Sequence, residues 1–136
     1  FIGDLKPEAG FLPPLGHMLR YRVLDWLNFV ATELHKSFTP LFKPDAGEGA
    51  QAFARRTLEA KLDYVDGAFG GGPFLMGEQL TLPDFYLFVM TGWAEVMGLS
   101  SDRRSRIGAF RETMLERPSV RQVLEREGLL QPQPAE

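Results

Sequence analysis

The strongest structural signal in this chain is the segment Leu80-Thr-Leu-Pro-Asp-Phe-Tyr-Leu-Phe-Val-Met90. Thr81 is a good N-cap residue, because its hydroxyl can accept a hydrogen bond from a free N–H of the first helical turn. Asp84 lies three positions later and can accept from the Thr81 N–H, which completes a capping box. Leu80 and Phe85 are spaced to form a hydrophobic staple around the cap. The pattern therefore predicts the start of a helix at Thr81.

No charged side chain occurs between Phe85 and Ala94. A helix that is apolar around its whole circumference is buried on every side, and this one is too short to span a bilayer. We therefore expect the central helix of a helical core, with Gly92 allowing a neighbouring element to approach closely.

Composition narrows the class of protein. The 136 residues fit one domain, and 44% apolar residues are enough for a real core. A net charge of -3 argues against nucleic acid as a partner. The chain has no apolar run of membrane length, so no membrane partner is expected. The absence of cysteine excludes disulfides and zinc–thiolate sites from this chain, and two histidines are too few for a histidine-rich metal site.

The longest helical pattern covers residues 18–42. Apolar residues recur there at steps of three and four, which predicts one buried stripe: Val23, Leu27, Val30, Leu34, Phe38 and Leu41. Pro40 falls inside the pattern, so the helix should bend or break after residues 35–37.

Polar and aromatic rows lie beside that stripe, which suits a cleft or a subunit interface. One of them is a polar strip at helical spacing: Tyr21, Asp25, Asn28, Thr32 and His35. One candidate site remains, formed by Asn28, Glu33, His35, Lys36 and Phe38. Spacing alone favours the alternative, a plain helix end with a surface histidine and lysine. No catalytic triad and no metal-binding motif occurs.

Three more helices are predicted at residues 50–69, 102–117 and 119–127. Their expected buried rows are Ala54, Leu58, Leu62, Val65 and Phe69; Ile107, Phe110 and Met114; and Val120, Val123 and Leu124. Asp102 is expected to cap the second of these helices. Charged residues on the first two are expected to face solvent, namely Arg55, Arg56, Glu59, Asp63 and Asp66, and Arg103, Arg104, Arg106 and Arg111. The predicted architecture is an all-α bundle of about five helices.

The ends of the chain lack this periodicity. Residues 1–5 are interpreted as the end of a helix of a preceding domain, and residues 6–16, rich in Pro and Gly, as an interdomain linker. The helical domain should cover residues 17–128, and residues 129–136 should form a tail. The chain is therefore expected to be a fragment of a longer protein.

Three segments resemble the C-terminal domain of the glutathione S-transferases. Thr81-Leu-Pro-Asp84 after Gly77-Glu-Gln-Leu80 resembles that family's capping box and staple, and Arg117-Pro-Ser-Val120 resembles the start of its final helix. The segment from Trp26 to Phe42 is similar to the first C-domain helix of the bacterial beta class, with Glu33-Leu-His-Lys-Ser-Phe38 as its most specific part.

The resemblance implies a thioredoxin-like N-terminal domain, absent from this chain, that supplies the reactive cysteine and most glutathione contacts. It implies that His35 and Lys36 approach the glutathione sulfur as catalytic and binding residues. Asn28 and Glu33 match positions that reach glutathione across a homodimer interface. The apolar co-substrate pocket would be lined by Phe38, Phe42 and Trp93.

The resemblance thus implies a cytoplasmic detoxification enzyme that uses glutathione as co-substrate and no metal. It would conjugate glutathione to small hydrophobic electrophiles or carry out related thiol chemistry. One alternative is a non-catalytic helical module for interaction or ligand binding. Another is a stand-alone helical domain without a cofactor. His35, Lys36 and Trp93 favour the enzyme, since a scaffold requires none of them.

Overall fold

The computed structural model describes residues 1–99 and 101–130, and this part of the chain is helical without a strand. Its six α-helices are α1 (Ile2–Leu5), α2 (Met18–Phe29), α3 (Glu48–Ala68), α4 (Leu82–Val96), α5 (Ser105–Leu115) and α6 (Pro118–Arg126). A π-helical stretch, η2 (Val30–His35), continues α2. Three short 3-10 helices are η1 (Pro7–Ala9), η3 (Thr39–Phe42) and η4 (Ser101–Arg103). The predicted all-α bundle is confirmed.

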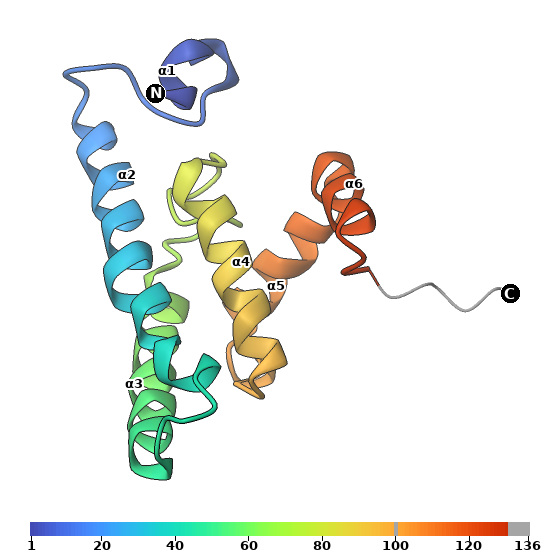
Figure 1. Ribbon diagram of the computed structural model, residues 1–136. Coiled ribbons are helices and arrows are strands. Elements are labelled where there is room, and N and C mark those ends of the chain that lie inside the picture. Colours follow the sequence, from blue (N-terminus) through green and yellow to red (C-terminus); the bar gives the residue numbers. More distant parts are fainter. Residues whose placement is uncertain (100, 131–136) are drawn as a thin grey trace, which may run out of the picture.

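The helices pack around α4, which lies in the middle of the bundle (Figure 1). Helix α2 and its continuation η2 contact α4 on one side, and α5 contacts both α3 and α4 on the other. Helix α6 packs on α5. Every predicted core residue of α3 and α5 is buried, whereas Val123 of α6 is 51% exposed, so its predicted inward position is wrong. The predicted tail lies mostly in residues 131–136, outside the described residues.

The start of α4 is held by the predicted capping box. The Asp84 carboxylate is fully buried and accepts hydrogen bonds at Oδ2 from the Thr81 N–H (2.7 Å) and the Thr81 hydroxyl (2.8 Å). Its Oδ1 accepts from the Leu75 N–H at 2.9 Å. Burial raises the pKa of Asp84, and these hydrogen bonds oppose the rise. One carboxylate therefore joins the cap to the preceding loop.

Two expectations about α4 are wrong for this chain. The helix is not buried on every side, because Val89 is 48% exposed while Leu87 and Met90 on the opposite face are buried. Within residues 1–99 and 101–130, no element approaches Gly92 closely. The nearest atom to the place of a Cβ there is an Arg111 guanidinium nitrogen, at 3.8 Å. Helix α4 thus has one core face and one partly open face.

Part of the predicted linker belongs to the packed structure. Leu12 is 7% exposed, and the Phe11 ring meets the Phe85 ring edge-on with centroids 5.3 Å apart. The Phe11 carbonyl accepts a hydrogen bond from the Leu82 N–H at 3.0 Å. Residues 11–12 therefore anchor the segment to the first turn of α4.

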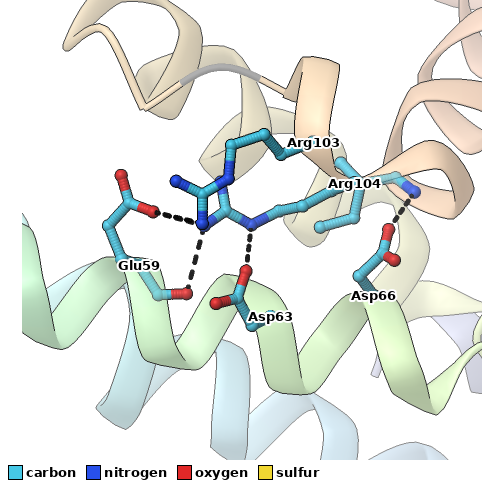
Figure 2. Close-up of polar contacts among 6 residues, drawn as sticks. Glu59, Asp63, Asp66, Arg103 and Arg104 are labelled. Carbon is cyan, nitrogen blue, oxygen red and sulfur yellow. Dashed lines mark hydrogen bonds and ion pairs between the residues drawn. The ribbon is translucent and has the colours of Figure 1, made fainter.

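The acidic side of α3 contacts the start of α5. The predicted solvent exposure of Arg104 is wrong, whereas Asp63 is exposed as predicted. Arg104 is only 2% exposed and lies against Glu59 and Asp63 (Figure 2). Its Nη2 donates to Glu59 Oε2 at 2.6 Å and its Nε to Asp63 Oδ1 at 2.7 Å. Burial opposes the charge of Arg104, but the two carboxylates outweigh it and raise its pKa. We call these three residues the arginine clamp.

The cap of α5 also comes from α3. The Ile107 N–H, in the first turn of α5, donates to Asp66 Oδ1 at 2.9 Å. The predicted capping by Asp102 is wrong, because Asp102 belongs to η4 and the helix begins later, at Ser105. A helix start requires acceptors for its free N–H groups, and here one is supplied by a neighbouring helix.

Candidate functional site

The predicted break in the first long helix is present, and it is preceded by the π-helical stretch η2. Pro40 lies in η3, directly after the break. In a π-helix hydrogen bonds reach the fifth residue, so each residue turns through a smaller angle than in an α-helix. Asn28 and Thr32 are exposed, whereas His35 is half-buried and faces α4. The polar strip expected from α-helical spacing therefore does not extend to His35.

Lys61 of α3 secures this break, a role that the sequence analysis missed. Its Nζ donates to the Glu33 carbonyl (2.9 Å) and the Ser37 hydroxyl (3.0 Å), and it pairs with Glu33 Oε2 at 2.8 Å. The hydrogen bond and charge of Lys61 lower the pKa of Glu33. Lys61 thus ties α3 to the segment in which the first long helix becomes irregular.

His35 lies between two aromatic side chains of α4. Its ring meets the Trp93 ring edge-on, with centroids 5.0 Å apart and an interplanar angle of 87°. Its Nδ1 is hydrogen-bonded to the Tyr86 hydroxyl. Tyr86 and Trp93 are seven residues apart, which places them on one face of α4. The sequence analysis missed Tyr86, although this spacing relative to Trp93 was a usable signal.

The three predicted pocket residues form one aromatic cluster. Trp93 contacts Phe42 at 4.8 Å and Phe38 at 5.7 Å between ring centroids. Phe42 is 48% exposed, whereas Phe38 is fully buried beneath the other two rings. Phe42 and Trp93 can therefore meet a ligand, and Phe38 supports them.

The structure does not join the other predicted site residues to this cluster. Asn28, Glu33 and Lys36 are exposed. Within the described residues none of them shares a hydrogen bond or ring contact with His35, Phe42 or Trp93. Residues 1–99 and 101–130 also contain no group of three His, Asp or Glu side chains placed to hold a metal ion. No helix in the same ranges is long and apolar enough to cross a membrane.

Comparison with known proteins identifies the family. The family described as "Glutathione S-transferase, C-terminal domain" matches residues 29–118. The chain is 40% identical over 129 residues to "Glutathione S-transferase GstA" of Escherichia coli O157:H7, covering 95% of this chain. It is 32% identical over 136 residues to "Glutathione S-transferase GST-4.5" of Xanthomonas campestris, again covering 95% of the chain and 67% of that protein.

Solved structures show the same relationship. A glutathione transferase from Methylococcus capsulatus superposes with a TM-score of 0.90 at 40% identity, covering 95% of this chain and 64% of that one. A sphingomonad glutathione S-transferase complexed with glutathione superposes with a TM-score of 0.88 at 34% identity, covering the same shares. This chain belongs to the glutathione S-transferase C-terminal domain family. It spans 64% of the length of the E. coli relative.

Proposed function

We propose that this chain is the helical half of a glutathione transferase of the bacterial beta class. Joined to a thioredoxin-like domain, it would conjugate glutathione to small hydrophobic electrophiles or perform related thiol chemistry. The observation that carries the proposal is the contact of His35 with Trp93 in a partly open aromatic cluster. A titratable ring beside an apolar wall suits a site in which a sulfur meets an apolar co-substrate.

In the proposed enzyme, the two domains contribute different parts of the active site. The thioredoxin-like domain would provide the sulfur site, because this chain has no cysteine. His35 would approach that sulfur, and Lys36 would add positive charge, which favours a thiolate. Phe42 and Trp93 would form the co-substrate wall, supported by Phe38.

Glutathione contacts from Asn28 and Glu33 would form across a homodimer interface, as the resemblance implies. Their exposure in this chain is compatible with contact to a second subunit. We propose the cytoplasm as the location and detoxification as the role. The sphingomonad relative, a complex with glutathione, supports glutathione as the co-substrate.

The test compares this chain alone with the same chain fused after a thioredoxin-like domain of a beta-class relative. Conjugation of a chromogenic aryl halide to glutathione is measured for both. We expect the chain alone to be inactive and the fusion to be active. Conjugation by the chain alone would overturn the two-domain proposal. A folded, dimeric fusion that binds glutathione-agarose but conjugates no electrophile would instead favour a non-catalytic module.

A further inference from the structure

We infer that Tyr86 is a positioning residue that places the ring hydrogen of His35 on Nε2, so that His35 acts as a hydrogen-bond donor. The inference rests on the proposed function only for the identity of the acceptor, a glutathione sulfur. Tyr86 is not one of the predicted site residues, and it has no role in the capping box.

The placement of the two rings supports the inference. Tyr86 lies on α4 and His35 at the end of η2, and their rings are nearly perpendicular, with centroids 5.8 Å apart and an angle of 85°. The Tyr86 hydroxyl is hydrogen-bonded to Nδ1 of His35. Trp93 fixes the ring plane from a second direction. Nε2 is therefore the ring nitrogen left to meet a ligand.

The direction of the hydrogen bond follows from the donors and acceptors present. A neutral imidazole has one N–H and one lone pair, whereas a phenol has one hydrogen to donate. In the described part of the chain, His35 Nδ1 is the hydrogen-bond partner recorded for the Tyr86 hydroxyl. If Nδ1 carried the hydrogen, the half-buried phenol hydrogen would have no protein acceptor there. Donation by Tyr86 to Nδ1 satisfies both groups.

The tautomer decides what His35 can do. The hydrogen bond at one ring nitrogen sets the state of the other. With Nδ1 accepting from Tyr86, the neutral ring presents an N–H at Nε2, which donates to an electron-rich sulfur. The opposite tautomer would present a lone pair and make His35 a general base. The structure favours the donor over the base.

Nitrogen NMR of this chain tests the tautomer without any activity. The chain has two histidines, so the imidazole spectrum is simple. Long-range proton–nitrogen spectra would be recorded about two pH units above the ordinary histidine pKa of about 6.5. His17 is an internal reference, because its Nδ1 accepts from the Leu19 N–H at 3.2 Å and its hydrogen must also lie on Nε2.

We expect His35 to show an N–H at Nε2 and a hydrogen-bonded lone pair at Nδ1. Tyr86→Phe should remove the hydrogen-bond shift at Nδ1 and allow a mixture of tautomers. Tyr64→Phe, which removes the hydroxyl of a 60% exposed tyrosine, is the matched control and should leave the His35 signals unchanged. A wild-type hydrogen on Nδ1, or a Tyr86→Phe spectrum identical to wild type, would overturn the inference. If Tyr86→Phe does not fold, the wild-type nitrogen shift at His35 Nδ1 decides, because a lone pair without the hydrogen-bond shift would also overturn the inference.

Kinetics of the two-domain protein then show whether His35 acts as a hydrogen-bond donor or as a general base. His35→Gln places an amide N–H near the position of Nε2 but cannot act as a base, whereas His35→Asn places it near Nδ1. We expect His35→Gln to retain at least about tenfold more kcat/KM than His35→Asn. We expect Tyr86→Phe to lose about tenfold, the lower end of the loss when a hydrogen bond that orients a metal-binding histidine is removed. Equal loss in both His35 variants would overturn the donor role. Unchanged activity in all of them would remove His35 from the proposed site and leave the NMR result standing.

Discussion

Arg104 and Asp63 are joined by a 2.7 Å hydrogen bond although 41 positions separate them in the sequence. Together with Glu59 they form the arginine clamp between α3 and the start of α5. The Arg104 side chain is 3% exposed, whereas that of Arg103 beside it is 75% exposed. Two neighbouring arginines thus have opposite environments.

Arg104→Ala should lower the free energy of unfolding by about 2 kcal/mol or more, because hydrogen bonds to charged groups contribute about 1.5–3 kcal/mol each. Arg103→Ala is the matched control, and its exposed contact with Glu59, at 4.0 Å, should cost less than about 0.5 kcal/mol. Urea denaturation of both variants measures the difference. Equal losses would show that the clamp contributes no more than a surface pair.

The capping box predicts coupled effects at Thr81 and Asp84. Thr81→Ala should cost about 1 kcal/mol. Asp84→Ala should cost about 2 kcal/mol, because it also leaves the buried Leu75 N–H without its acceptor. In a double-mutant cycle the two losses should be less than additive, since both remove one reciprocal contact. Strictly additive losses would contradict the capping box.

Asp84 should also give stability a pH dependence. Burial raises its pKa in the native state above the ordinary 3.8, so the native chain keeps this proton to higher pH than the unfolded chain. The stabilisation associated with that proton is complete below 3.8 and is lost as pH rises through the raised pKa.

The unfolding free energy of wild type minus that of Asp84→Asn should therefore fall as pH rises through this range. Urea denaturation at a series of pH values measures it. Glu78→Gln, the same chemical change at an exposed carboxylate, is the control. A difference for Asp84→Asn that grows with pH would refute the raised pKa.

His35→Ala in the two-domain protein should lower turnover by about 100-fold, the lower end of the loss when one hydrogen-bond donor to a developing anion is removed. Its stability loss should stay below about 1 kcal/mol, the usual contribution of one hydrogen bond. His17→Ala is the control, because it also removes a histidine hydrogen bond, at the start of α2, but lies outside the site. Activity and melting temperature are measured on the same samples. A His35→Ala enzyme with unchanged kinetics would remove His35 from the site.

Local signals explain what the sequence predicted correctly. Thr81 and Asp84 are three residues apart, and the apolar rows of α3 and α5 repeat every three or four residues. Such patterns depend only on helix geometry and can be read along the chain. The break at Pro40 is local in the same sense, because the ring of proline acts on its own turn.

Contacts between distant segments explain what was missed. Glu59, Asp63 and Asp66 have the spacing of an exposed acidic face, and only the fold shows that Arg104 and the Ile107 N–H lie against them. The pairing of His35 with Tyr86 spans 51 positions and depends on the π-helical turn, which α-helical spacing does not predict.

Asp66 of α3 caps α5, so the stability of the first turn of α5 depends on α3. In the described part of the chain, the N-cap residue Arg104 makes no side-chain cap hydrogen bond, and an 11-residue helix is marginal in water by itself. The Ile107 N–H gains the Asp66 acceptor once α3 has formed and docked. We therefore expect α5 to consolidate late in folding, after a long loop has closed. The acidic face of α3 would then act as the template on which the C-terminal third of the bundle assembles.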